Sequence, residues 1–162
     1  MTSSTETLKT QFDLQTQQFN NTLDGISDSE AESRNSDRIN HMKFIAGHLL
    51  EVRVNLITQM TGSQPDTTYA AQFGYGVALD PNASYTPIEE IRSKWNNTAT
   101  AISGGIIKIP EETLASKSPI PVPVADDTLL GLLSFLINHE AYHIGQLGLL
   151  RKMAGKEAMS YQ

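Results

Sequence analysis

The sequence contains no cysteine, which excludes disulfide bonds, thiolate metal ligands and a cysteine nucleophile. It also lacks any apolar run close to the ~20 residues that a membrane-spanning helix requires. The N-terminal segment has neither the basic nor the apolar region of a signal peptide, so we expect a cytoplasmic protein. Positive charge is not in excess. The formal net charge of −6 gives no electrostatic reason to expect nucleic acid or an anionic membrane as a partner.

Segments typical of β-strands are scarce, whereas helical patterns cover most of the chain. Apolar residues spaced by three and four positions predict four long helices, over about 6–26, 38–60, 86–105 and from about 127 onward. The connection 63–84 is rich in glycine, proline and small polar residues, and the connection 116–127 contains three prolines. The pattern predicts one all-α domain over residues 1–162, a four-helix bundle with long crossover connections.

Two of these helices begin with capping signals. The third opens with Thr86 and Pro87, and Glu89 follows, which is the pattern of a capping box. The last helix follows Asp126 and Asp127, and either aspartate can serve as its cap.

The last helix carries an unusual polar group within an apolar row. Steps of three and four along it select Leu129, Leu132, Leu136, His139, His143, Gln146 and Leu150. We expect this row to face the bundle core, with His139 and His143 only ~40° apart and about one turn from each other. One cation could then bind a nitrogen of each imidazole. Without a partner, burial of these polar groups would cost a few kcal/mol.

Two other interpretations remain open for this pair. The histidines could form hydrogen bonds with buried side chains and bind nothing, or this face of the helix could be less buried than the pattern implies. A second apolar row beside the first argues against exposure and indicates contact with another subunit. It consists of Leu130, Leu133, Ile137, Ile144 and Leu147.

A metal site needs a third protein ligand. The chain has four histidines, and the remaining two, His41 and His48, both lie in the second predicted helix. His48 is flanked by apolar residues at helical spacing, so we expect it to point inward and to be the third ligand. His41 stands among polar residues at the start of that helix, and we expect it to be exposed or at the rim of a pocket.

The letters HEAYH at 139–143 also match the H-E-x-x-H motif of zinc proteases. The extended form of that motif needs glycine at 146 and histidine at 149, where this chain has Gln146 and Leu149. Glu157 is the one glutamate downstream, and it is followed by only five residues. We therefore reject a protease of this type.

Three segments together resemble the DinB-like family, which includes the bacillithiol and mycothiol S-transferases. They are NHMKFIAGHLLEVR at 40–53, PIEEIRSKW at 87–95 and HEAYHIGQLGLLRKMAG at 139–155. The resemblance extends over roughly residues 35 to 155, and its most specific part is H-x-x-x-H-x-G-Q in the last helix together with G-H-L in the second. It implies a four-helix bundle, commonly a homodimer. It also implies a divalent metal, often nickel or zinc, held by His48, His139 and His143.

Because three imidazole ligands are neutral, they would not reduce the +2 charge of such an ion. They would also leave at least one coordination position open. The ion would lower the pKa of a bound water or thiol and so produce a nucleophile. Glu140 is a candidate general base, although a position on the helix surface is an equal alternative. Gln146 is a candidate for binding substrate or an imidazole ligand, or for a plain core amide.

Two functions follow as alternatives. The first is a metal-dependent transferase or hydrolase that acts on a small electrophile, with a low-molecular-weight thiol as possible cosubstrate. The second is a non-enzymatic, stress-related metal- or ligand-binding protein that uses the same residues. An open apolar pocket beside the metal would favour the enzyme, and a sealed site would favour binding alone.

Overall fold

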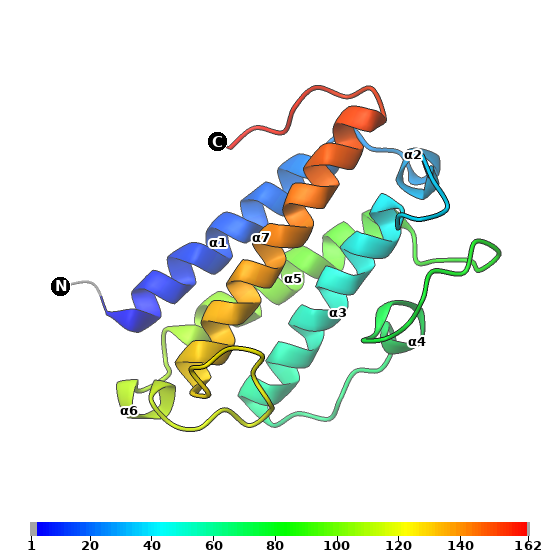
Figure 1. Ribbon diagram of the computed structural model, residues 1–162. Helices are drawn as coiled ribbons and strands as arrows, with labels where there is room; N and C mark the ends of the chain where they lie inside the picture. The colour runs from blue at the N-terminus through cyan, green and yellow to red at the C-terminus, as the bar shows by residue number, and fades with distance from the viewer. Residues whose placement is uncertain (1–2, 162) are drawn as a thin grey trace.

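The computed structural model describes residues 3–161 and is built from helices and their connections (Figure 1). The helices are α1 (Ser4–Leu23), α2 (Asp28–Glu32), α3 (Met42–Thr61), α4 (Ala70–Phe73), α5 (Ile88–Ile106), α6 (Glu111–Leu114) and α7 (Leu129–Met153). None of the helices in this described range is long and apolar enough to cross a membrane. The predicted all-α four-helix bundle is confirmed.

The four long helices form a ring in which each packs against two neighbours. Helix α1 packs against α5 and α7, and α3 packs against the same two helices. Helices α1 and α7 run in one direction, and α3 and α5 run in the other (Figure 1). The connection 62–87 therefore traverses the length of the bundle, while 107–128 joins two helix ends on the same side.

Short helices occupy parts of the connections. Helix α2 lies between α1 and α3, in a segment whose sequence is mostly polar, and α4 lies within the long connection that follows α3. Phe73 of α4 packs directly on Gly47 of α3, where an added Cβ atom would lie only 2.4 Å from the Phe73 ring. The absence of a side chain at Gly47 thus lets the connection pack closely against α3, one residue before His48.

Both predicted caps differ from the structure. Thr86 makes no cap for α5. Instead the Ile88 backbone N–H donates to Asp28 Oδ1 at 2.8 Å, so a residue of α2, 60 positions away, caps this helix. The cap of α7 is Thr128, whose Oγ1 accepts from the Gly131 backbone N–H at 3.1 Å.

Helix α7 is rotated relative to the predicted orientation. The residues that face the interior are chiefly those of the second apolar row and the positions aligned with it, namely Leu133, Glu140, Ile144, Leu147 and Arg151. His139, His143 and Gln146 lie beside this row and are half-buried. The prediction of a core row is right for Leu132 and Leu150, which are buried, and wrong for the polar residues of that row. Three residues of the second row, Leu133, Ile144 and Leu147, are buried inside the protomer. Both neighbouring rows of α7 are largely apolar, so their period could not decide which of the two is the buried one.

Candidate metal centre

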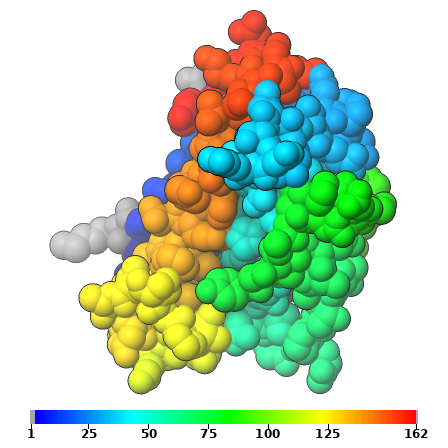
Figure 2. Space-filling model, turned by 45° about the vertical axis from the view of Figure 1, so that its right-hand side comes forward, coloured from blue at the N-terminus to red at the C-terminus, as the bar shows by residue number. Residues whose placement is uncertain are grey.

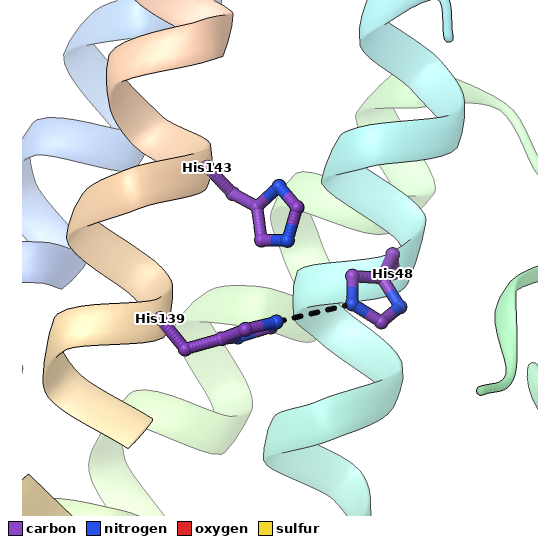
Figure 3. Close-up of side chains that lie close together, drawn as sticks. All are labelled: His48, His139 and His143. Carbon is purple, nitrogen blue, oxygen red and sulfur yellow. Dashed lines mark hydrogen bonds between the residues drawn. The ribbon is translucent and has the colours of Figure 1, made fainter. Parts of the chain in front are cut away.

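His48 of α3 and the two histidines of α7 point toward one another across the gap between these helices (Figure 3). Each offers a ring nitrogen, and the three nitrogens all lie within 4.8 Å of one another. The ring centroids are 4.6 to 5.2 Å apart. The convergence of His48, His139 and His143 agrees with the prediction from sequence, and such a cluster could hold a metal ion.

His48 is oriented by the connection that packs on α3. Its Nδ1 lies 3.0 Å from the carbonyl oxygen of Phe73. Because a carbonyl oxygen can only accept, Nδ1 carries the proton and the neutral ring presents the lone pair of Nε2. That Nε2 faces the cluster, 3.3 Å from His139 Nε2. The hydrogen bond to Phe73 therefore selects the tautomer that a metal ligand requires.

His143 is oriented in a similar way by Gln146, one turn further along α7. His143 Nδ1 lies 2.7 Å from Gln146 Oε1, and Gln146 Nε2 donates to the Tyr142 hydroxyl at 3.3 Å. The amide orientation that serves both contacts places the proton of His143 on Nδ1 and leaves Nε2 unprotonated. Gln146 thus makes the imidazole contact that the sequence suggested for it, and a role in substrate binding stays a prediction.

His139 is the least satisfied member of the cluster. Its Nδ1 is buried and has no hydrogen-bond partner. Burial lowers the pKa of His139 to about 4, and the neighbouring His143 and His48 rings act in the same direction. Burial also lowers the pKa of His143, and the hydrogen bond that His143 donates to Gln146 opposes this effect. Both rings are therefore neutral at pH 7, which is the form that binds a metal.

The donor set fits a divalent ion of borderline character. Imidazole nitrogens suit zinc and nickel among other transition metals. Nitrogens held tetrahedrally at about 2.0–2.1 Å from one ion lie about 3.3–3.4 Å from each other. The separation of 3.3 Å between the Nε2 atoms of His48 and His139 matches that spacing. Two neutral rings cannot both donate across this gap, so at least one nitrogen lone pair faces the cluster.

A large cleft reaches the cluster between α3 and α7. It has a volume of about 850 Å³, and His48 and His139 form part of its wall. The connections 62–87 and 107–128, green and yellow in Figure 2, border this face of the molecule. They contribute Tyr75, which is fully exposed, and the apolar segment 120–123 to the cleft wall. The site is therefore open to small molecules.

A second, smaller cavity adjoins the third histidine. It measures about 330 Å³ and is lined by His143, Gln146, Tyr142 and residues at the start of α3 and end of α7. The cluster thus borders two cavities, one reached from the side of His48 and His139 and one from the side of His143.

Glu140 does not join the histidines. It lies in the core, and both of its carboxylate oxygens accept hydrogen bonds from Arg53, from Nε at 2.7 Å and from Nη2 at 2.8 Å. The alternative that placed Glu140 on the helix surface is wrong, since its exposed fraction is 1%. Burial raises the pKa of Glu140, and the hydrogen bonds and charge of Arg53 oppose that rise. Its role as general base stays a prediction that this geometry does not support.

His41 is also placed differently from its prediction. It is buried, and its Nδ1 caps α3 by accepting from the Phe44 backbone N–H at 3.0 Å. Its ring packs edge-on against Tyr85. Histidine is not among the residues that normally cap a helix, so this role is not predictable from the sequence.

One residue of the cleft wall was not predicted from the sequence. Glu51 follows His48 by three positions, lines the same cleft and is only 8% exposed. Helical spacing alone would have placed it on the same face as His48.

Comparison with known proteins supports the same family as the sequence motifs. The family model described as the DinB superfamily matches residues 11–147, which includes all four long helices in whole or in part and all three clustered histidines. No curated protein matched the chain. The match extends over most of the sequence, and the fold and the histidine cluster agree with it. The chain belongs to the DinB superfamily.

Proposed function

We propose that this protein is a metal-dependent enzyme that binds nickel or zinc through His48, His139 and His143 and transfers a thiol to, or hydrolyses, a small electrophile. The observation that carries the proposal is the opening of the histidine cluster into a cleft of about 850 Å³. A site that only stored a metal or held the fold together would need no such opening. The cleft therefore favours the enzyme over the non-enzymatic binding protein.

A divalent ion, when bound, supplies Lewis-acid activation of a thiol or a water molecule near neutral pH. The chain's own residues prepare the site for it. The Phe73 carbonyl and Gln146 fix the ring orientation of His48 and His143, and partial burial keeps His139 and His143 unprotonated. Three neutral ligands leave room for a further ligand, because a catalytic site of this kind uses three protein donors.

The two cavities beside the cluster favour transfer over hydrolysis. A thiol and an electrophile must both reach the reacting centre, whereas hydrolysis needs room for one organic substrate. The larger cavity borders His48 and His139, and the smaller borders His143. We therefore propose a low-molecular-weight thiol as cosubstrate, with the thiol and the electrophile in separate cavities.

We also propose a homodimer formed through the exposed side of α7. Three large apolar side chains on this helix, Tyr142, Leu149 and Met153, are 64%, 61% and 45% exposed. They are seven and four positions apart, which places them along one stripe of the helix. An apolar stripe of this kind is typical of a contact surface.

Turnover tests the proposal directly. The purified protein, loaded with zinc or nickel, is mixed with a panel of thiols and electrophiles, and the loss of free thiol is followed with and without chelator. We expect metal-dependent thiol consumption by the wild type and none by His139→Ala. Absence of metal-dependent turnover across thiols, esters and amides would contradict the enzyme and favour the binding protein.

A further inference from the structure

We infer that the cleft beside the histidine cluster binds a small molecule with an elongated apolar body and a positively charged nitrogen, and that Glu51 recognises this charge. Such a molecule would be the substrate of the proposed enzyme, and only the word substrate rests on the proposed function. The evidence is a buried carboxylate, two aromatic rings and an apolar wall in one cleft.

Glu51 is a buried acid without a cation. The residue as a whole is 8% exposed, and its Oε1 accepts a hydrogen bond from Asn55 Nδ2. Among the residues that the structure describes, no lysine or arginine forms an ion pair with it. The core pair of Arg53 and Glu140 shows the usual solution for a buried acid in this protein. Glu51 lines the cleft, so a cation bound there would lie beside an unpaired negative charge and be attracted to it.

The surroundings of Glu51 suit an organic cation. Tyr75 and Phe135 line the same cleft and present aromatic rings. Aromatic faces attract ammonium groups, and aromatic rings are the typical recognition elements for quaternary ammonium ligands. A metal cation would instead need several oxygen or nitrogen ligands around it, and the metal-ligand cluster in the described chain does not include Glu51.

The rest of the wall is apolar and long. Val52, Leu56, Leu132 and Leu136 line the cleft from α3 and α7, and Pro121 and Val122 line it from the opposite connection. Such a wall binds hydrocarbon and excludes highly polar molecules. The ligand would therefore place its charge at Glu51 and its apolar body along these side chains.

The cation position lies beside the metal position and not on it. Three residues along a helix correspond to about 4.5 Å of axial rise, so Glu51 lies about one turn from His48. Oε1 of Glu51 is bonded to Asn55, four residues further on, and Glu51 is not among the residues whose ligand atoms converge with the histidines. A ligand can thus be held by its charge while another part of it faces the cluster.

Calorimetric titration with octyltrimethylammonium tests the inference, because a quaternary nitrogen cannot coordinate a metal. The full chain is titrated both metal-free and loaded with zinc, and 1-octanesulfonate serves as the anionic probe of equal length. We expect the cation to bind at least about tenfold more tightly than the anion. Glu51→Gln should weaken cation binding about tenfold, while Glu112→Gln, which removes an exposed charge on α6, should not change it.

A second variant tests the aromatic contribution and does not depend on a buried residue. Tyr75 is fully exposed, so Tyr75→Leu should fold normally. It should weaken cation binding about two- to fivefold, and Tyr75→Phe should not. Equal binding of cation and anion, or an unchanged affinity in folded Glu51→Gln, would overturn the inference. So would a loss of zinc binding, and not of cation binding, in Glu51→Gln. Cation binding without zinc uptake would overturn only the proposed metal enzyme.

Discussion

Two polar clusters lie inside this bundle, formed by neighbouring residues of the same two helices, and they differ in how they are satisfied. Arg53 of α3 and Glu140 of α7 are each 1% exposed and are bound to each other through two hydrogen bonds. Five positions earlier on α3 and one position earlier on α7, His48 and His139 are half-buried, and one of their four ring nitrogens, His139 Nδ1, is buried without a partner.

The first cluster joins all four long helices. The Arg53 guanidinium also donates to Thr16 Oγ1 and to the Phe12 carbonyl of α1, and it lies 3.4 Å from the ring centroid of Trp95 on α5. Its hydrogen bonds and stacking are all made within the protein. The three histidines instead bring a ring nitrogen each to one place beside an open cleft, and within the described part of the chain no charged partner lies between them. A buried charge pair whose hydrogen bonds are all made within the protein is structural, whereas converging imidazole nitrogens beside an open cleft indicate a binding site.

The largest expected effect is a loss of stability when the Arg53–Glu140 pair is disrupted. Glu140→Gln should lower the free energy of unfolding by about 3–5 kcal/mol, because it leaves the Arg53 charge buried without its partner. Urea denaturation followed by circular dichroism measures this loss. The matched control is Glu89→Gln, which breaks an exposed pair with Arg92 and should cost less than about 1 kcal/mol.

An equally small effect of both substitutions would contradict the structural role. A Glu140→Gln protein that keeps its stability but loses turnover would return Glu140 to the role of general base, for which a loss of roughly 10²–10⁴ in rate is expected.

Removing one histidine of the cluster should weaken metal binding and leave the bundle folded. We expect His143→Ala to lower metal affinity by more than about 100-fold, since even residues that only support ligands contribute 10- to 100-fold. Competition with a chromophoric chelator measures the affinity. Helical circular dichroism should persist in this variant and after chelation, because the core does not depend on the metal. Loss of most helical signal on chelation would show the metal to be structural.

His41→Asn is the matched control for that experiment. It removes a histidine outside the cluster and keeps a side chain that can cap α3. Its metal affinity should equal that of the wild type.

The orientation of His143 by Gln146 can be tested separately. Gln146→Leu removes the acceptor for His143 Nδ1 and should lower metal affinity about 10- to 100-fold. Gln146→Glu keeps an acceptor oxygen in the same place and should retain most of the affinity. Equal losses in the two variants would show that the hydrogen bond does not orient the ring.

The smallest expected effect is on stability as a function of pH in the metal-free protein. Burial lowers the pKa of His139 from its ordinary value of 6.5 to about 4. Between these values the unfolded chain binds a proton that the folded chain does not, so stability should fall as the pH decreases from 6.5 to 4. His139→Gln should reduce this dependence. Urea denaturation at pH 7 and pH 5 measures it, and an unchanged slope in the variant would contradict the shift.

Much of the architecture followed from sequence because it depends on local patterns. The spacing of apolar residues marked the four long helices, and the spacing of His139 and His143 within one helix placed their side chains together. His48 could be selected because it stood in an apolar stretch while His41 did not. The three histidines converge despite the rotation of α7, because all three still lie beside the interface between α3 and α7.

What the sequence did not predict depends on contacts between distant residues. Local spacing predicts a catalytic or surface position for Glu140. Its buried position depends on Arg53, which lies 87 positions away in the sequence. The cap of α5 comes from Asp28 and not from the adjacent Thr86. The sequence does not predict the rotation of α7, because two neighbouring rows of this helix are largely apolar and only packing against α1 and α3 decides which of them is buried.

The central claim is that His48, His139 and His143 bind one divalent ion per chain. Titration of the metal-free protein with zinc and with nickel tests this claim most directly. Bound metal is measured by elemental analysis after removal of free ions. We predict one ion per chain for the wild type and none for the triple variant His48→Ala, His139→Ala, His143→Ala. No bound metal in the wild type, or one ion per chain retained by the triple variant, would contradict the claim.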